Sequence, residues 1–228
     1  MKGVAEKVRE AGIAVFGPDA QGAQLEGSKS FSKEFMIAHD LPTARYEKCT
    51  SEQEAMDYLH EVGAPIVVKA DGLAAGKGVI VAQTVAEAQE AVRSMMDGRK
   101  FGQAGARVVI EECMTGPEVT VLAFCDGEHL VPMPSSQDHK RAFDGNQGPN
   151  TGGMGVYSPV PIVTDEEHAT MVKVMEQTVA ELAAEGIDYR GCLYGGFFGI
   201  GQLVLQLPKD HMLDHNKIPP AFFLIVAG

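Results

Sequence analysis

A glycine-rich loop between two strands is the feature that most constrains the fold of this chain. Residues 71–78 read Asp-Gly-Leu-Ala-Ala-Gly-Lys-Gly and separate two apolar segments, 65–70 and 79–82, that are typical of strands. A Walker A loop would need G-x-x-x-x-G-K-[ST] leading into a helix. Here the first two glycines stand too close together, Gly78 replaces the Ser or Thr, and a strand follows. We therefore expect a flap that joins two antiparallel strands and closes over a triphosphate; a plain glycine hairpin is the alternative.

Helix and strand signals alternate along the rest of the chain, which is the pattern of α/β and α+β proteins. Ser, Thr and Glu at capping-box spacing mark three helix starts, at Ser51, Thr84 and Thr164. Helices are predicted over residues 1–11, 20–39, 51–63, 84–96 and 164–185. Strands are predicted over residues 13–16, 65–70, 79–82, 107–111, 118–125, 128–133 and 191–198. Residues 134–161 form a long loop, which in a compact domain is usually functional or disordered.

The charge balance excludes several classes of function. The chain of 228 residues is 45% hydrophobic, enough for a sizeable core, and carries a formal net charge of −12. An acidic surface repels phosphate at long range, which disfavours nucleic-acid wrapping and polybasic membrane binding. An anionic ligand must therefore meet locally concentrated positive charge. No glutamate follows Glu185, so the acidic excess lies before that residue.

The cysteines and the termini predict a cytoplasmic setting. Four cysteines stand apart from one another, with no C-x-x-C pair, so we expect reduced core thiols rather than disulfides or a structural metal. The opening residues 1–12 are charged and contain no apolar core of a signal peptide. No apolar run reaches the length of a membrane span.

Charged residues in apolar surroundings point to a nucleotide. Lys69 ends an otherwise apolar strand, where a charge is costly without a counter-charge that a phosphate would provide. Glu111, Glu112 and Glu118 flank a short hinge between two strands, so three carboxylates are expected close together. Carboxylates and hinge amides can bond an adenine amino group and ribose hydroxyls. Solvated surface glutamates are the alternative explanation.

The long loop suits a sugar phosphate. Residues 137–141 read Gln-Asp-His-Lys-Arg, and arginine binds phosphate bidentately while lysine supplies a point charge. The glycine-rich run 148–155 offers backbone amides. A disordered loop is the alternative, but Phe143, Met154 and Tyr157 are expected to anchor it.

Taken together, these motifs support a specific resemblance. The spacing of Lys29, Lys69, the 71–78 loop, the paired glutamates and Glu118 resembles the ATP-grasp superfamily. The 137–141 motif followed by Gly-Pro-Asn-Thr-Gly-Gly-Met-Gly resembles the phosphoribosylamine-glycine ligase (glycinamide ribonucleotide synthetase) family, over about residues 11–198. The resemblance implies an α+β ATP-grasp fold, in which two α/β subdomains clasp ATP.

The resemblance also implies roles for individual residues. Lys29 and Lys69 would contact ATP phosphates with Lys77 in the flap, while Glu111 would receive the adenine amino group, Met114 would offer a hinge amide and Glu118 would hold the ribose. The implied nucleotide-binding set is Lys29, Lys69, Gly72, Gly76, Lys77, Gly78, Glu111, Glu112, Met114 and Glu118. The implied catalytic residues are Asp138, Lys140 and Arg141, and the implied substrate-binding residues are His139, Asn150, Thr151 and Gly152.

The implied reaction belongs to purine biosynthesis. ATP would phosphorylate the glycine carboxylate, and the amine of 5-phosphoribosylamine would attack the acyl phosphate to give glycinamide ribonucleotide, ADP and phosphate. The partners are then small molecules, with no nucleic acid and no membrane. The protein's work is positioning and neutralising phosphate charge.

The chain departs from the family pattern at both ends. We expect residues 1–17 to be a remnant of a preceding substrate domain that is otherwise absent, 18–198 to be the ATP-grasp region with a smaller nucleotide-clasping subdomain at about 43–115, and 199–228 to be a divergent tail. The family uses Mg²⁺ or Mn²⁺, but the usual Glu and Asn ligands have no counterpart here, so no metal ligand is assigned. Asp210, His211, Asp214 and His215 are better explained as a solvated turn, because imidazole suits magnesium poorly.

Two other functions remain open at the level of sequence. The chain could be a nucleotide-binding or partner-binding module that keeps the grasp without catalysis, or another ATP-grasp carboxylate-amine ligase. The sequence does not address the oligomeric state.

Overall fold

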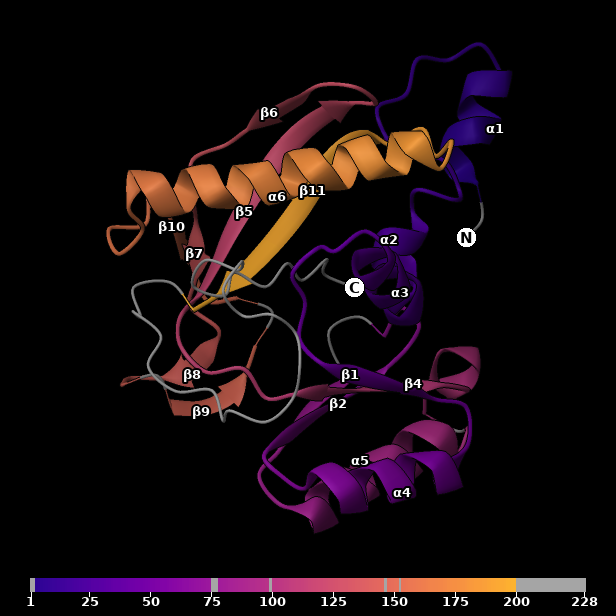
Figure 1. The fold of residues 1–228 in the computed structure, drawn as a ribbon, viewed down its shortest axis with the longest axis vertical. Helices are drawn as coiled ribbons and strands as arrows, with labels where there is room; N and C mark the ends of the chain where they lie inside the picture. The colour runs from indigo at the N-terminus through magenta and orange to yellow at the C-terminus, as the bar shows by residue number, and fades with distance from the viewer. Residues whose placement is uncertain (1–2, 75–77, 99, 146, 152, 200–228) are drawn as a thin grey trace.

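The fold comprises two main sheets, each with its own hydrophobic core and covering helices (Figure 1). The computed structural model describes residues 3–74, 78–98, 100–145, 147–151 and 153–199. A short helix, α1 (Val4–Glu10), precedes both units. The expected tail, 199–228, lies outside the described residues except for Gly199.

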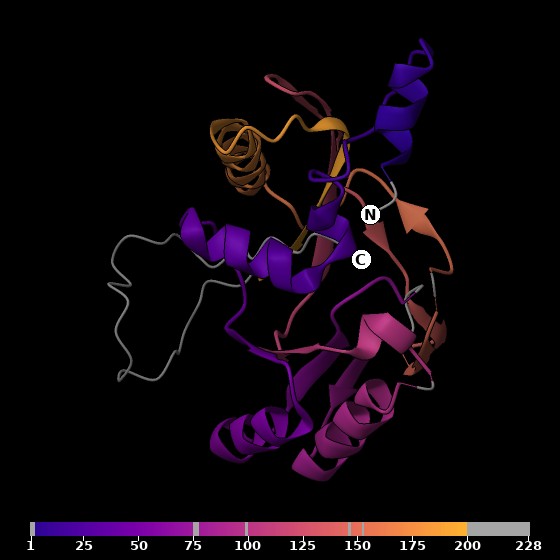
Figure 2. The ribbon, with the colours of Figure 1, turned by 90° about the vertical axis from the view of Figure 1, so that its right-hand side faces the viewer.

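The smaller unit is a four-stranded antiparallel sheet covered on one face by two helices. Its strands, in spatial order, are β1 (Tyr46–Cys49), β4 (Val108–Glu112), β2 (Ile66–Ala70) and β3 (Val79–Ala82). The helices α4 (Glu52–Val62) and α5 (Val85–Met96) lie side by side against it, at the bottom of Figures 1 and 2. Leu59 and Met95 are fully buried against the sheet, and each such side chain contributes about 1.5–3 kcal/mol to stability.

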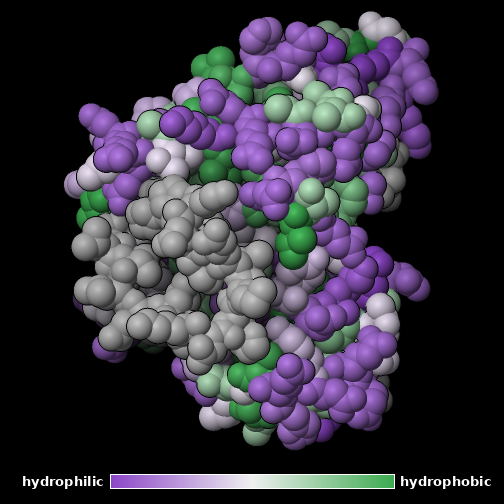
Figure 3. All heavy atoms as spheres, in the orientation of Figure 1, coloured by the Kyte–Doolittle hydropathy of each residue, from purple (hydrophilic) through white to green (hydrophobic). Residues whose placement is uncertain are grey.

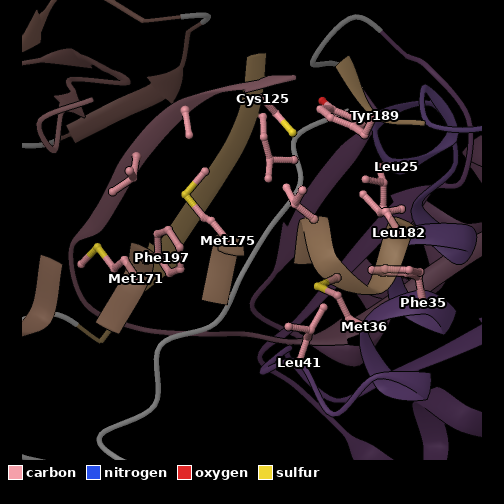
Figure 4. Close-up of a cluster of buried hydrophobic side chains, with 14 of the residues drawn as sticks. Leu25, Phe35, Met36, Leu41, Cys125, Met171, Met175, Leu182, Tyr189 and Phe197 are labelled. Atoms are coloured by element: carbon pink, nitrogen blue, oxygen red, sulfur yellow. The ribbon is translucent and has the colours of Figure 1, made fainter. Parts of the chain in front are cut away.

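The larger unit is a three-stranded sheet with one long helix across it. The strands are β11 (Arg190–Phe198), β5 (Glu118–Asp126) and β6 (Leu130–Pro132), and the helix is α6 (Asp165–Ala184). Two further helices, α2 (Gln24–Gly27) and α3 (Lys29–Ala38), add to the same core. Figure 4 shows Met171 and Met175 close to Phe197, with Phe35 and Met36 from α3 in the same cluster.

The three predicted helix starts are confirmed. The side chains of Ser51, Thr84 and Thr164 each accept a hydrogen bond from the backbone amide three residues later. Each cap satisfies an amide that the helix itself leaves unpaired and contributes about 1 kcal/mol. The strands predicted at 65–70, 79–82, 107–111, 118–125, 128–133 and 191–198 are also found, with ends shifted by a few residues.

Two predicted elements are wrong. Residues 13–16 form no strand, and the side chains of Ile13 and Phe16 are exposed. The helix predicted over 20–39 is divided, because Ser28 is extended (φ −142°, ψ 113°) and caps α3 with its side chain. Strand β1 was not predicted, since only Cys49 of its four residues is buried and its sequence carries no apolar run.

The long loop 134–161 contains ordered strands rather than being irregular. Strand β7 (Gln137–Asp138) pairs with β10 (Val156–Tyr157), and β8 (Arg141–Phe143) pairs with β9 (Gln147–Asn150). Outside this loop, the chain forms a short 3-10 helix, η1 (Gly102–Gly105), between α5 and β4. The expected apolar anchors are wrong, because Phe143, Met154 and Tyr157 are all exposed. Hydrogen bonds of the backbone and of polar side chains order this loop instead.

The cysteine thiols are free, and the face of the molecule in Figure 3 is mostly hydrophilic. All four cysteines are free; Cys49 and Cys125 are buried as expected for core thiols, whereas Cys192 is exposed. Outside the grey atoms, the face in Figure 3 is mostly hydrophilic, with hydrophobic residues in small separate groups. Among the described residues, no helix has the length and apolar character needed to cross a membrane.

The C-terminal end of α3 is held against α6 by a histidine between two carboxylates. His39 lies 2.9 Å through Nδ1 from Glu181 and 2.7 Å through Nε2 from Glu185. The hydrogen bond to Glu185 is the main cause that raises the pKa of His39, and Glu181 adds to it against a smaller effect of burial. The protonated imidazole is therefore favoured in the folded state.

This arrangement predicts a pH-dependent contribution to stability. A histidine whose folded pKa is raised stabilises the fold below its unfolded value, about 6.5, and loses that contribution as pH rises through the folded pKa. The difference in unfolding free energy between wild type and H39Q should therefore be largest at about pH 5.5 and should vanish at about pH 9. Urea unfolding at a series of pH values measures it. H60Q, at a histidine that contacts the Gln89 amide rather than a carboxylate, is the control; a difference for H39Q that does not change with pH would contradict this account.

Candidate functional site

Two lysines share one buried carboxylate where the units meet. Glu111 of β4 lies beside β2, and its Oε1 is 3.0 Å from Nζ of Lys69. Its Oε2 is 3.1 Å from Nζ of Lys33, which comes from α3. The exposed fractions of these side chains are 3% for Glu111, 12% for Lys69 and 6% for Lys33. The counter-charge of Lys69, which we expected from a phosphate, is thus supplied by Glu111.

Lys33 is the residue that sequence reasoning missed. Its ammonium also donates to Thr43 Oγ1 at 2.9 Å and to the Ala44 carbonyl at 3.1 Å. Burial lowers the pKa of Lys33, and the charge of Glu111 opposes that shift. A signal was present, because Lys33 follows Lys29 by four residues and so lies on the same face of the helix.

Lys29 joins this group from the first turn of α3. Its Nζ donates to the Gly72 carbonyl at 3.3 Å. Burial lowers the pKa of Lys29, as does the positive charge of Lys69, while Asp71 and Glu111 act in the opposite direction. Lys29 is therefore close enough to Lys69 for their charges to interact, and we call Lys29, Lys33, Lys69 and Glu111 the lysine cluster.

The base of the glycine loop is fixed to α3 by a buried aspartate. The Asp71 carboxylate accepts from the Ser30 amide at 2.7 Å and the Ser30 hydroxyl at 3.0 Å, and it lies 2.8 Å from the Arg107 guanidinium. A carboxylate at the first turn of a helix is favoured by the helix dipole. The loop thus starts from a rigid support beside Lys29.

The glycines at the two ends of this loop have no room for a side chain. A Cβ on Gly72 would lie 2.8 Å from Cβ of Ala104, and one on Gly78 would lie 2.5 Å from Cβ of Ala74. Both distances are shorter than real contacts, so the close approach of the backbone requires glycine here. Gly76 and Lys77 lie outside the described residues.

The residues expected at the hinge lie at the end of β4, in the connection after it and at the start of β5. Glu112 accepts from the backbone amide of Arg45 at 3.0 Å and from its Nε at 3.1 Å, so its carboxylate is directed to the edge strand. Met114 is half-buried in the connection between β4 and β5, which joins the two units. Glu118 opens β5.

One ion pair connects the hinge side to the long loop. Nζ of Lys140 lies 2.6 Å from Oε2 of Glu118 and 3.6 Å from Oδ1 of Asp138. Burial would lower the pKa of Lys140, but the hydrogen bond and charge of Glu118, aided by Asp138, raise it overall. The structure therefore brings together the residue expected at the ribose and two residues expected at the reacting groups.

The other predicted loop residues that the structure describes contact the backbone of the loop itself. Arg141 is exposed, and its guanidinium donates to the Gly148 carbonyl at 2.7 Å. The His139 amide donates to Gly155, and Thr151 donates twice to the Lys140 carbonyl, through its amide and its hydroxyl. The backbone of Asn150 pairs with that of Arg141, and Gly152 lies outside the described residues. Within the described ranges, Arg141 has no hydrogen bond or ion pair with the lysine cluster.

Two hollows of the surface lie away from the lysine cluster. One, of about 340 Å³, lies beside α1 and is lined mainly by small and apolar residues. The other, of about 610 Å³, lies over β1 and α4 and is lined by Glu47, Glu54, Asp57 and Glu61 among others. The four carboxylates of the second hollow repel a phosphate, and no lysine lines the first. Neither hollow therefore has the chemistry of the lysine cluster.

A metal site is not found in the part of the chain that the structure describes. No group of three or more His, Cys, Asp or Glu side chains there could hold a metal ion. Asp210, His211, Asp214 and His215 lie outside that part. Because Mg²⁺ at a nucleotide is usually held by one or two carboxylates together with the phosphates, this observation concerns a metal site made by protein side chains alone.

Comparisons with known proteins agree with this geometry. A family model described as "Phosphoribosylglycinamide synthetase, ATP-grasp (A) domain" matches residues 27–214. Phosphoribosylamine-glycine ligase of Escherichia coli (strain K12) is 55% identical over 197 residues, covering 86% of this chain and 46% of that protein. The enzyme of the same name from Allochromatium vinosum is 57% identical over 195 residues, covering 85% and 46%. The chain spans about half the length of the curated relatives it matches.

Solved structures give the same result. The crystal structure of phosphoribosylamine-glycine ligase from Thermotoga maritima aligns with a TM-score of 0.77 and 36% identity, over 82% of this chain and 48% of that one. The biotin carboxylase domain of 2-oxoglutarate carboxylase from Hydrogenobacter thermophilus aligns with a TM-score of 0.70 over 97% of this chain and 43% of that one. At 17% identity, the second likeness concerns the fold alone.

Proposed function

Because the chain belongs to the phosphoribosylglycinamide synthetase family through its ATP-grasp domain, we propose that it provides the ATP-binding and ligation portion of a phosphoribosylamine-glycine ligase. The reaction joins glycine to 5-phosphoribosylamine and yields glycinamide ribonucleotide, ADP and phosphate, a step of purine biosynthesis. The lysine cluster is the observation that carries this proposal.

The lysine cluster suits a polyphosphate. Two ammonium groups contact one carboxylate, and the charge of Lys29 interacts with this group, in a chain whose net charge is −12. Charges in a partly buried site interact more strongly than on the surface, so a local excess of positive charge attracts phosphate despite the acidic surroundings. We propose that Lys29 and Lys69 contact the ATP phosphates, with Lys77 and Gly72, Gly76 and Gly78 in the flap that covers them.

The hinge side supplies contacts for the nucleoside. We propose that Met114 presents a backbone amide to adenine, with Glu112 beside it, and that Glu118 holds the ribose. Both oxygens of the Glu111 carboxylate have lysine partners. An adenine amino group would therefore share Glu111 with these lysines.

The long loop would hold the reacting groups. A glycine carboxylate oxygen attacks the terminal phosphorus of ATP, giving glycyl phosphate and ADP. The amine of 5-phosphoribosylamine then attacks the carbonyl carbon, loses a proton and expels phosphate. Lys140 and Arg141 would neutralise phosphate charge and Asp138 would position the amine, while His139, Asn150, Thr151 and Gly152 would bind substrate.

The setting of this reaction is part of the proposal. Free thiols at all four cysteines support a reducing compartment, and we propose the cytoplasm. The partners are ATP, glycine and 5-phosphoribosylamine rather than nucleic acid or membrane. The division into 1–17, 18–198 with a clasping subdomain at 43–115, and 199–228 is likewise proposed; the separate core of the small sheet supports its middle part.

Product formation tests the proposed function. The chain is incubated with ATP, magnesium, glycine and 5-phosphoribosylamine, and ADP and glycinamide ribonucleotide are measured. We expect ADP to accumulate beyond one equivalent per chain only when both co-substrates are present, because glycine alone can form ADP once, together with bound glycyl phosphate. ATP binding without ADP would assign the chain to non-catalytic nucleotide-binding modules, and ADP formed with a different carboxylate but not with glycine would indicate another ATP-grasp ligase.

The role of Arg141 gives a more specific prediction. The R141A variant should raise the KM for 5-phosphoribosylamine about tenfold, because it removes one charge-assisted contact to phosphate. Its affinity for ATP should not change. R93A, at an exposed arginine of α5 that pairs with Glu52 at 3.3 Å, is the matched control. Steady-state kinetics measures both, and an unchanged KM for the R141A variant would refute the assignment.

A further inference from the structure

A continuous chain of buried charges links α3 to the strand that carries Lys69. Lys33, Glu111 and Lys69 lie in series, joined by contacts of 3.1 Å and 3.0 Å through the two oxygens of one carboxylate. No more than 12% of any of these side chains is exposed. Such a chain is costly to bury unless each charge is compensated, so its arrangement calls for a physical reason.

Lys33 cannot itself bind a ligand. An ammonium group has three protons, and those of Lys33 face three acceptors: Glu111, Thr43 and the Ala44 carbonyl. The ring of Tyr46 covers it further, with its centroid 5.5 Å from Nζ. Any effect of Lys33 on a nucleotide must therefore pass through Glu111.

Lys69 differs from Lys33 in this respect. Within the described part of the chain, Glu111 is the one ion-pair partner of its ammonium. An ammonium group has three protons, so Lys69 can bond a further acceptor beside Glu111. Without Lys33, the Glu111 charge would be balanced by Lys69 alone, and this pair would carry no net charge. With Lys33, two ammonium groups face one carboxylate and leave one positive charge in excess.

We propose that Lys33 is a positioning residue, which neutralises Glu111 so that Lys69 offers a full positive charge to the phosphates of a nucleotide. This inference rests on the proposed function, because it assigns the excess charge to ATP. It adds to that function a residue that touches no substrate yet sets the affinity for the phosphate groups.

The ratio of adenosine Kd to ATP Kd tests this role. Both ligands are titrated calorimetrically into the full chain without metal ions. The K33M variant keeps a side chain of similar length without the charge, and it should lower the ratio about tenfold by weakening ATP far more than adenosine. K48M is the matched control, because Lys48 pairs with Glu34 on the surface. A purely structural role would weaken both ligands together and would overturn the proposal.

Removing the carboxylate as well supplies the rescue. In the K33M/E111Q double variant Lys69 again carries the excess charge, and the ratio should return to within about threefold of wild type. If K33M alone does not fold, the double variant still decides: a ratio near wild type supports the proposal, and one about tenfold lower overturns it. A wild-type chain without preference for ATP over adenosine overturns the proposed function too. A wild type that prefers ATP, with K33M unchanged, overturns the role of Lys33 alone.

Discussion

Replacing Glu111 by alanine is expected to lower the free energy of unfolding by about 3–5 kcal/mol, because breaking a buried ion pair leaves its partner uncompensated. Two ammonium groups depend on this carboxylate, and their side chains are 6% and 12% exposed. Burial already lowers the pKa of Lys33, and the carboxylate is the largest influence that opposes this shift. Loss of the carboxylate therefore removes the counter-charge of both lysines at once.

Urea unfolding with linear extrapolation measures this effect. The neighbouring residue Glu112 provides the control, because it pairs with an Arg45 side chain that is 81% exposed. Such surface pairs contribute about 0–1 kcal/mol, so E112A should be nearly neutral. If E111A and E112A were equally stable, the lysine cluster would not be the buried electrostatic centre described here.

The K69M variant is expected to bind ATP about 100-fold more weakly than wild type, because it loses charge-assisted hydrogen bonds of roughly 1.5–3 kcal/mol. It should lose less stability than E111A, since Glu111 keeps its contact with Lys33 at 3.1 Å. Isothermal titration with ATP measures the affinity. K48M serves again as the control, and a K69M affinity within about threefold of wild type would exclude Lys69 from the phosphate site.

The family and the ATP-grasp fold, both inferred from the sequence, are confirmed by the family match and the alignment to solved structures. The sequence predicted the structure correctly where that structure depends on interactions between residues close together in the chain. The caps at Ser51, Thr84 and Thr164 depend only on residues a turn away, so their positions could be read directly. The glycine loop was likewise located from its own composition.

The errors have long-range causes. Strand β1 exists because β4 pairs with it, although Tyr46-Glu47-Lys48-Cys49 carries no apolar pattern. The helix predicted over 20–39 is broken at Ser28, where the backbone also bridges to Gly72, forty-four residues away. Such partners are decided by the tertiary fold, which overrides local propensity.

The site shows the same limit. Lys69 and Glu111 were both singled out, but their pairing depends on the register in which β2 lies beside β4. The spacing of Lys33 from Lys29 places both on one face of α3, but the burial of Lys33 follows from its contact with Glu111 of β4. A buried lysine can be predicted from sequence only when the partner strand and its register are known.

A crystal structure of this chain with a non-hydrolysable ATP analogue tests the central claim most directly. The account predicts phosphate oxygens at hydrogen-bond distance, about 2.7–3.2 Å, from Nζ of Lys29 and Lys69, with Lys33 still bound to Glu111. Phosphates bound elsewhere, with Lys29 and Lys69 facing no ligand oxygen, would contradict it.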